Sequence, residues 1–366
     1  MKAVKIILKV ILAVVLFVGV FIGYLTIREY RPKQLEEVKV NNNSVTKVTL
    51  NETISLMTFN IGYAGLGKDE DFVMDGGKKG RADSKDVLLS YLEGIKTTLK
   101  DNQVDIYLLQ EVDKPSRRSY FTNQANTFKE LFSNYDESFS LNFKADFVPF
   151  PVSFTDYLGK VESGIQTLSK YEIEESFRHQ TPGSFAWPLR VANLKRAIQV
   201  NYLPIVGTTK KLVIINLHLS AYDDGGMRIL ETEYLMELLK QEKELGNYVI
   251  VGGDFNQTYE AVENNYLIPE AEVKKGLWAP LILKESSVAE GYQFIYSEIA
   301  TCRSLDKPLT DELNHYYYII DGFIISDNVE FVSFENLAQG FLYSDHEPLI
   351  LEVKLLPWNI IKLLTL

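Results

Sequence analysis

Carboxylate, amide and imidazole side chains recur at the ends of apolar, strand-like runs along the chain. They are Asn60, Gln110-Glu111, Asn216 with His218, Asp254 with Asn256, Asp321, and Asp345-His346. Taken one at a time, each has an ordinary explanation, because Asn and Asp are common turn formers at strand ends. Taken together, these six positions include two of the chain's four histidines. The set therefore indicates a shared site rather than a series of turns.

The residue types at these positions limit the chemistry of such a site. Carboxylates with Asn and His, and without cysteine, favour a hard cation that binds oxygen, such as Mg²⁺ or Mn²⁺. Asp321 lies between isoleucine and glycine and needs a partner, because an unpaired buried carboxylate is costly. An Asp–His pair supplies that partner and fixes the imidazole tautomer. These residue types therefore predict a site for a hard divalent cation.

The elements that must position these residues alternate between strands and helices. Buried strands are predicted where apolar residues run together, at ISLMTFNI, VDIYLLQEV, VIINLHL, YVIVGGDF, YYYIIDGFII and EPLILEV. Residues 226–245 and the segment KDVLLSYLEGIKTTLKDN have the spacing of amphipathic helices. The alternation continues without a change in composition, so we predict one α/β domain over residues 52–354. The long stretches 62–83 and 266–313 are rich in loop signals, and loops of that length are commonly functional.

Composition limits the classes of partner. The 366 residues include 49 acidic and 38 basic side chains, and the resulting charge of −11 disfavours a broad electrostatic grip on nucleic acid. A nuclease stays compatible, because a bound cation can reverse the field at the site itself. The single cysteine, Cys302, excludes an intrachain disulfide and a Cys-based zinc cage, and suits a bacterial or cytosolic protein. We expect Cys302 to be a small buried side chain rather than a nucleophile.

The first 27 residues are predicted to form a transmembrane segment. Residues 10–27 carry no charge before the basic Arg28 and are long enough to cross the hydrocarbon core of a bilayer. Lys2, Lys5 and Lys9 orient the N-terminus toward the cytoplasm, although basic residues after the segment leave an inverted topology open. The segment lacks the small-residue pair of a cleavage site, which favours an uncleaved signal anchor over a cleaved signal peptide. We therefore predict a single-pass protein of the cell membrane with an extracytoplasmic catalytic domain.

Two segments flank the predicted domain. Residues 28–51 are polar, with a proline and an asparagine run, and are predicted to be a tether. Residues 355–366 are strongly apolar, which indicates a final packed element or, alternatively, a tail that contacts the membrane.

The order of TFNIG, LLQEVD, ESGIQTLS, NLHLS, VGGDFN, IIDGFIIS and SDHEP resembles the endonuclease/exonuclease/phosphatase superfamily. This superfamily includes pancreatic-type deoxyribonucleases, abasic-site endonucleases, bacterial sphingomyelinases and inositol-polyphosphate 5-phosphatases. The resemblance extends from about Ile54 to Val353 and implies a four-layer α/β/β/α sandwich of two packed mixed sheets flanked by helices. In this chain the sandwich would follow one N-terminal transmembrane helix, and the site would lie at one edge of the paired sheets.

The resemblance also implies the metal ligands. Glu111 is implied to be the principal ligand of Mg²⁺ or Mn²⁺, with Asn60 and Asp345 close to the cation. The cation would neutralise charge on the phosphate that an in-line water attacks.

The remaining motif residues are implied to act on the water and the phosphate. Asp254 and Asn256 would orient or activate the water and hold a phosphate oxygen, and Asp321 would pair with His346, which stabilises the pentavalent transition state. His218 is similar to a second histidine of the deoxyribonuclease and sphingomyelinase branches that the abasic-site branch usually lacks. The residues alone leave open which of Asp254, His218 and His346 is the general base.

Further polar residues are candidates for substrate binding. The candidates are Arg117, Tyr120, Asn216 and Arg303, and Arg118 and Lys195-Arg196 lie in comparable contexts. For the cationic candidates a solvated loop is the competing interpretation.

Three functions remain open at this point. The first is a phosphodiesterase or phosphatase acting on phospholipid head groups or other esters near the membrane, where a tether raises the effective concentration. The second is an extracellular nuclease anchored to the membrane. The third is a non-catalytic binding module on the same fold.

Overall fold

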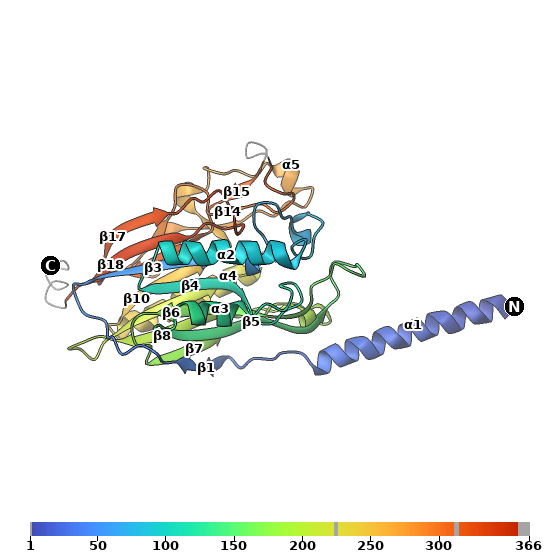
Figure 1. Cartoon of the computed structure of the whole chain (residues 1–366), viewed down its shortest axis with the longest axis horizontal. Helices are drawn as coiled ribbons and strands as arrows, with labels where there is room; N and C mark the ends of the chain where they lie inside the picture. Colours follow the sequence, from blue (N-terminus) through green and yellow to red (C-terminus); the bar gives the residue numbers. More distant parts are fainter. Residues whose placement is uncertain (1, 223–225, 311–314, 358–366) are drawn as a thin grey trace.

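Two seven-stranded β-sheets pack face to face in the computed structural model, which describes residues 2–222, 226–310 and 315–357 (Figure 1). The first sheet has the order β1 (Leu35–Glu37), β7 (Glu175–Gln180), β8 (Ala197–Pro204), β9 (Lys211–His218), β10 (Tyr248–Asp254), β16 (Asp321–Ser326), β13 (Tyr292–Tyr296). The second has the order β17 (Val329–Asn336), β18 (Leu349–Leu355), β3 (Thr53–Asn60), β4 (Ile106–Asp113), β6 (Gly159–Ser169), β5 (Asp136–Val148), β2 (Val40–Asn41). Both sheets are mixed.

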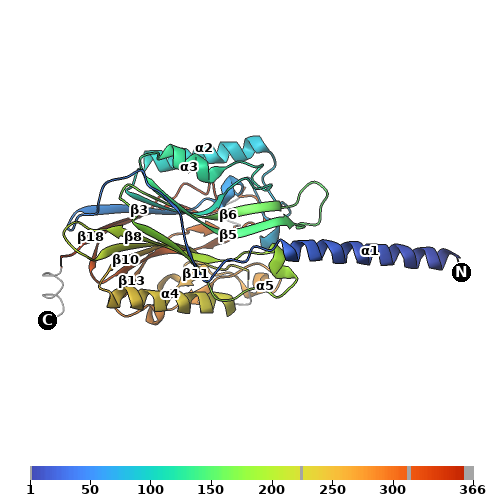
Figure 2. The ribbon, with the colours of Figure 1, turned by 90° about the horizontal axis from the view of Figure 1, so that it is seen from below.

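Helices cover the outer face of each sheet, which gives four layers (Figure 2). Helices α2 (Lys85–Asp101) and α3 (Gln124–Leu131) lie on the second sheet, and α4 (Gly226–Glu244) lies on the first. Side chains such as Leu108 and Ile250 fill the space between the sheets and exclude water from it. The predicted four-layer α/β/β/α sandwich is confirmed.

Local sequence explains the layers. Every residue of β10, the run YVIVGGD, is buried, as expected for a central strand covered on both faces. In α2 the buried residues Leu88, Leu92, Ile95 and Leu99 recur at helical spacing, and the Ser84 hydroxyl caps the first turn by accepting a hydrogen bond from the Val87 amide.

One parallel pair of strands in each seven-stranded sheet sets the position of the polar motif residues. Strands β3 and β4 are parallel in the second sheet, and β9 and β10 are parallel in the first. The carboxyl ends of all four therefore reach one edge of the sandwich, where Asn60 pairs in register with Gln110, and His218 with Asp254.

The long segments between the sheets' strands form small elements near this edge. The stretch 62–83 contains only the short 3₁₀ turns η1 (Gly62–Ala64) and η2 (Val73–Asp75). The segment from residue 257 to residue 318, which includes the predicted stretch 266–313, holds η4 (Glu260–Val262), α5 (Glu270–Val273) and η5 (Glu285–Ser287). It also holds the short pairs β11 (Gln257–Tyr259) with β12 (Leu281–Leu283) and β14 (Cys302–Arg303) with β15 (Tyr317–Tyr318). A further turn, η3 (Leu189–Ala192), precedes β8.

The segment 28–51 is integrated into the fold, in contrast to the predicted tether. Strand β1 pairs with β7, and β2 pairs with β5, so the segment adds an edge strand to each sheet. The asparagine run contributes to this anchoring, because the amides of Asn43 and Ser44 donate to the buried carboxylate of Asp136 at 2.6 and 2.7 Å. Edge strands pair through backbone groups, which polar side chains do not reveal.

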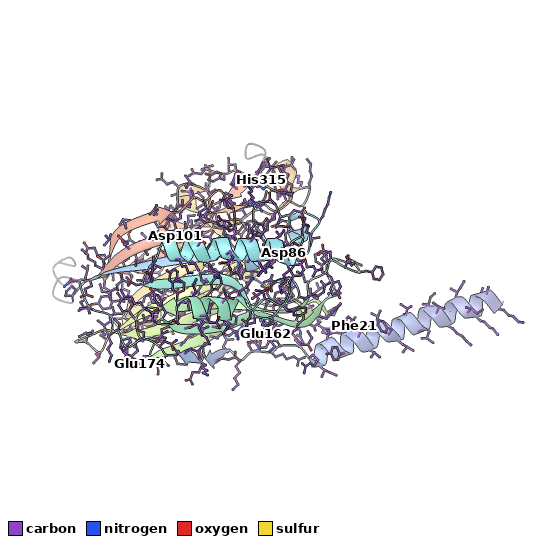
Figure 3. All side chains as sticks on the ribbon, viewed as in Figure 1. Phe21, Asp86, Asp101, Glu162, Glu174 and His315 are labelled. Carbon is purple, nitrogen blue, oxygen red and sulfur yellow. The ribbon has the colours of Figure 1, made fainter. Side chains whose placement is uncertain are left out.

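One described helix, α1 (Lys2–Ile27), is long and apolar enough to cross a membrane, a property that it would share with a signal sequence. It projects away from the domain and meets it only near its C-terminal end (Figures 1 and 2). Phe21 lies at this junction (Figure 3) and makes an edge contact with Phe147, with ring centres 5.6 Å apart. Of the predicted C-terminal tail, 355–366, the first residue, Leu355, ends β18. The part of the tail from residue 358 onward lies outside the described residues.

Candidate active site

Polar side chains from both sheets meet at the edge where the parallel strands end. We call this group the polar floor; it consists of Asn60, Glu111, His218, Asp254, Asp345 and His346. The amide nitrogen of Asn60 donates to Asp254 Oδ2 at 3.0 Å and so joins the second sheet to the first. Residues predicted from separate motifs are therefore brought together.

Asp254 is the centre of the polar floor. Its Oδ1 accepts a hydrogen bond from the Asn256 amide at 2.9 Å, and its Oδ2 lies 3.3 Å from His218 Nε2 and 3.7 Å from His346 Nε2. Burial and the Asp321 carboxylate raise the pKa of Asp254 to about 7. A carboxyl group with this pKa can accept or release a proton near neutral pH.

The pKa values of the two histidines of the polar floor are shifted in opposite directions. The Nδ1 of His346 lies 2.8 Å from Asp321 Oδ2, which directs Nε2 toward Asp254. Burial opposes protonation, but the charge of Asp321 raises the pKa of His346 well above its ordinary value. Burial lowers the pKa of His218 well below its ordinary value, and the nearby Arg196 adds to this effect. These opposite shifts favour the protonated form of His346 and the neutral form of His218.

Five residues of the cavity lining have a buried side-chain nitrogen or oxygen without a hydrogen-bond partner among the described residues. Two of these atoms, Nδ1 of His218 and Nη1 of Arg196, belong to side chains beside the polar floor; the others are on Tyr63, Asn142 and Arg303. A buried polar group without a hydrogen bond is costly, so such atoms indicate a missing ligand or water. A phosphate oxygen can accept a hydrogen bond from Arg196, and a hydroxyl or water can donate to His218.

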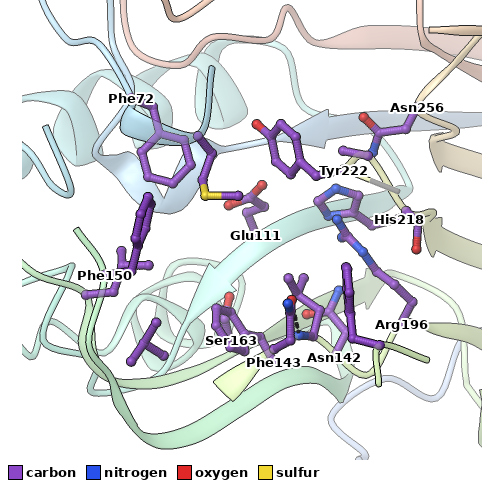
Figure 4. Close-up of a pocket in the computed structure, with 18 of the residues that line it drawn as sticks. Phe72, Glu111, Asn142, Phe143, Phe150, Ser163, Arg196, His218, Tyr222 and Asn256 are labelled. Atoms are coloured by element: carbon purple, nitrogen blue, oxygen red, sulfur yellow. Dashed lines mark hydrogen bonds between the residues drawn. The ribbon is translucent and has the colours of Figure 1, made fainter. Parts of the chain in front are cut away.

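Glu111 and Asp345 form a pair of carboxylates suited to a cation. Glu111 lies in a β-bulge of β4 with φ of 53°, and this left-handed conformation turns its side chain into the cavity (Figure 4). Burial raises the pKa of both residues, and the charge of Asp345 adds to the shift of Glu111 while Arg118 opposes it. Asp345 is buried and the Glu111 side chain is 24% exposed, so two carboxylates that repel each other share one cavity. Such a pair fits a divalent cation, and oxygen donors favour Mg²⁺ or Mn²⁺.

Two clusters among the described residues have ligand atoms within 4.8 Å of one another, namely Cys302-Asp345-His346 and Asp254-Asp321-His346. In the second, Nδ1 of His346 is already bonded to Asp321. In the first, burial raises the pKa of the Cys302 thiol to about 12, so a thiolate ligand is disfavoured. We therefore regard the Glu111–Asp345 pair as the better cation site, and Cys302 is the small buried side chain expected from the sequence.

Arg118, rather than the predicted Arg117, reaches the polar floor. Its guanidinium donates to Asp113 at 2.9 Å and lies 3.6 Å from Glu111 Oε2, so it orients the Glu111 carboxylate. Arg117 instead stacks on the Tyr157 ring and donates to the Thr155 carbonyl at 2.9 Å, outside the cavity lining.

The other three substrate-binding candidates have structural contacts. The Tyr120 hydroxyl donates to the Ala82 carbonyl at 2.7 Å. Asn216 lies between the sheets and accepts a hydrogen bond from Gln110 at 2.8 Å. Arg303 lines the cavity, but its Nη2 donates to the carbonyls of Leu66, Gly67 and Glu70, which ties down the 62–83 loop.

Arg196, which precedes β8, was a candidate for which a solvated loop was the competing interpretation, and it lines the cavity. Three further lining residues were not among the predicted site residues. Tyr63, Tyr222 and Asp75 come from loops whose path the sequence pattern does not specify. The Tyr222 hydroxyl donates to Asp75 Oδ1 at 2.8 Å.

Asp75 gives a test of the electrostatics of the cavity. Burial raises the pKa of Asp75 to about 7, against the opposing hydrogen bond from Tyr222. The folded-state pKa exceeds the unfolded one, so this group is expected to destabilise the fold progressively as pH rises from about 4 to about 7. Asp75→Asn should therefore raise the free energy of unfolding at pH 8 by about 1–2 kcal/mol and leave it unchanged at pH 4. Denaturant titration at both pH values measures this, and an equal effect at both would contradict it.

The polar floor is one end of a large cavity of about 650 Å³. The other side is apolar, and we call it the apolar wall; it includes Phe21, Ile22, Leu25, Phe143, Val148, Phe150, Leu158, Leu189, Val191 and Leu194. Figure 4 shows Glu111 in the middle, with His218 and Arg196 to one side and Phe72 and Phe150 to the other. The cavity thus combines a charged reaction site with an extended apolar surface.

A sequence model of the Endonuclease/Exonuclease/phosphatase family matches residues 57–279 of this chain. The chain belongs to this family. The match begins in β3 and includes Asn60, Glu111, His218, Asp254 and Asn256. Members of the family are metal-dependent hydrolases of phosphate esters, which agrees with the chemistry of the polar floor.

Solved structures of the family share the fold. An endonuclease/exonuclease/phosphatase from Beutenbergia cavernae DSM 12333 is 13% identical, with a TM-score of 0.57 over 84% of this chain and 72% of that one. The human Nocturnin catalytic domain with bound sulfate anion is 18% identical, with a TM-score of 0.51 over 87% and 97%. The family protein from Bacteroides vulgatus is also 18% identical, with a TM-score of 0.51 over 83% and 100%. Comparison with curated proteins gave no match.

Proposed function

We propose that this chain is a divalent-metal-dependent hydrolase of phosphate esters that acts at a membrane surface. The observation that carries the proposal is the convergence of the polar floor, with its paired carboxylates and charged His346, inside one cavity. A non-catalytic binding module would not need carboxylates that repel each other in one cavity.

Glu111, Asn60 and Asp345 would hold Mg²⁺ or Mn²⁺. The cation, when bound, would neutralise charge on the non-bridging oxygens of the phosphate. Arg118 keeps the Glu111 carboxylate in place, and Arg196 would donate to a phosphate oxygen through its unpaired Nη1.

Asp254, His218 and His346 would carry out the proton transfers of the reaction. Asp254 would accept a proton from the attacking water, because its pKa of about 7 keeps part of the population ionised at neutral pH. His346, held by Asp321, would donate from Nε2 to the charge that develops on the phosphate. Neutral His218 would accept a hydrogen bond from the water or the leaving alcohol at Nδ1.

Contacts at the end of α1 favour a retained anchor over a cleaved signal peptide. Leu25 is buried, and the Glu29 carboxylate is bound by Lys195 at 3.0 Å and by Arg190 at 3.3 Å. Trp187 Nε1 donates to Thr26 Oγ1 at 3.1 Å. Cleavage near the end of the helix would remove these contacts and part of the apolar wall. With basic residues at the N-terminus, the catalytic domain would lie outside the cytoplasm.

A substrate panel tests the proposal. The full chain in detergent or nanodiscs would be given sphingomyelin, a phosphoinositide, an aryl phosphodiester, RNA and plasmid DNA, with Mg²⁺ or Mn²⁺ and at 50 and 200 mM salt. We expect EDTA-sensitive hydrolysis of small or lipid esters that changes little with salt. Hydrolysis of nucleic acid alone that falls by orders of magnitude at the higher salt would favour the nuclease instead. Metal-independent binding without any turnover would favour the binding module.

A further inference from the structure

We propose that the apolar wall is an acyl-chain site that receives its ligand directly from the bilayer, so that the substrate is a lipid phosphoester. This inference rests on the proposed function, because it places the phosphate of that lipid on the polar floor. The phosphate and the chain would lie in one cavity, with the chain directed toward the end of α1.

The first observation is that the membrane helix itself contributes to the reaction cavity. Phe21, Ile22 and Leu25, from the last two turns of α1, line the same cavity as Asn60 and His346. A helix that served only as a tether would not need to contribute side chains to the reaction cavity. A chain that leaves the bilayer along this helix would therefore pass directly onto the wall.

The second observation is that polar contacts fix this junction. Arg28 Nε lies 2.8 Å from Asp146 Oδ2, and the Tyr24 hydroxyl donates to the same carboxylate at 3.3 Å. Asp146 belongs to β5, the strand that also supplies Phe143 and Val148 to the apolar wall. The orientation of the cavity relative to the helix is thus built into the fold.

The third observation concerns the rim of the cavity. The loop between β5 and β6 has Phe150 and Leu158 in the cavity lining, and its tip carries the fully exposed Val152 and Phe154. This loop projects on the same side of the domain as α1 (Figures 1 and 2). Exposed apolar side chains beside a membrane helix are expected to enter the interfacial region of the bilayer. The rim would then open the cavity toward the lipid.

The alternative occupant, a nucleic acid, fits these features poorly. Its backbone would need cations along the path out of the site, but the wall is apolar and the whole chain carries a charge of −11. Hydrocarbon in contact with such a wall is instead stabilised in proportion to the area removed from water.

A series of n-alkyl p-nitrophenyl phosphodiesters, from methyl to dodecyl, tests the acyl-chain site with one readout. In each, water adds to phosphorus, the bond to the nitrophenol oxygen breaks, and p-nitrophenolate, a proton and the alkyl phosphate leave. With the full chain in nanodiscs, we expect kcat/KM to rise with each methylene by up to about fourfold until the wall is filled. A flat series, with EDTA-sensitive hydrolysis of all esters, would overturn the acyl-chain site and leave the proposed function standing.

The variant Leu189→Ser separates the effect of contact with the apolar wall from the effect of long-chain esters partitioning into the nanodisc. Leu189 lines the cavity yet is 66% exposed, so its replacement is expected to leave the fold intact. We expect the ratio of dodecyl to methyl rates to fall about tenfold or more. The matched control is Leu245→Ser, because Leu245 is 58% exposed and lies outside the lining. Equal ratios in the two variants would contradict the proposal.

If no ester is hydrolysed, the proposed function is rejected. A binding measurement then tests separately whether the acyl-chain site exists. Octyl phosphate should still bind more tightly than ethyl phosphate, and Leu189→Ser should remove most of the difference while Leu245→Ser keeps it. Equal binding of the two phosphates by the unmodified chain would reject the acyl-chain site as well.

Discussion

Replacing Glu111 by alanine is expected to lower kcat/KM for phosphate-ester hydrolysis by several powers of ten. The change removes one of the two carboxylates, Glu111 and Asp345, that line the cavity and that would hold the cation in the proposed reaction. Glu111→Gln should lose nearly as much, because it keeps the shape and removes the charge. Steady-state kinetics at saturating Mg²⁺ and Mn²⁺ measures both effects.

The stability of these variants separates loss of the cation from loss of the fold. Burial disfavours the charge of Glu111, so the metal-free Glu111→Gln protein should unfold at the same temperature as the unmodified chain or higher. Addition of Mg²⁺ should then stabilise the unmodified chain and not the variant. Glu237→Gln, on the exposed face of α4, is the matched control and should behave as the unmodified chain. Near-normal turnover by either Glu111 variant would contradict the assignment.

His346→Ala carries the second large expected effect, a loss of about 10²–10⁴-fold in kcat. The variant removes the imidazole that Asp321 holds with Nε2 toward Asp254. Asp321→Asn should also reduce kcat, because it removes the charge that keeps His346 protonated and oriented. The losses should not add in the double variant, since Asp321 acts through His346. Additive losses would show that Asp321 has a separate role.

The core of the fold and most of the polar floor could be predicted from the sequence for a physical reason. Central strands are continuous apolar runs, so the polar residue that ends each one is conspicuous, as Asn60 and Asp254 are. Parallel strands bring those ends to one edge of the sandwich. The order of the motifs carried the resemblance to the family, which implied the four-layer fold. The predicted helix over 226–245 is found as Gly226–Glu244 for the same reason, its helical spacing.

Residues on loops could not be placed in the same way. Arg117 and Arg118 are neighbours of one type, and only the path of the chain after β4 decides that Arg118 turns toward Glu111. Arg303 was a candidate for phosphate binding, but its guanidinium is used by backbone carbonyls of a loop more than 200 residues away in sequence. Pairings of this kind depend on tertiary packing, which no local pattern records.

The apolar wall was beyond prediction for another reason. It combines the end of α1, the β5–β6 hairpin and the loop before β8, three segments whose apolar residues have ordinary local explanations. In the sequence, Phe21 is interpreted as part of a transmembrane helix and Leu189 as a surface residue. Only their meeting beside the polar floor gives them a shared function.

The most direct test of the central claim is the hydrolysis of one aryl phosphodiester by the purified full chain, before and after removal of divalent cations. We predict that EDTA abolishes turnover, that Mg²⁺ or Mn²⁺ restores it, and that His218→Ala and His346→Ala both lack it under restored conditions. Turnover that persists in EDTA, or that survives in both variants, would contradict a metal-dependent reaction at the polar floor.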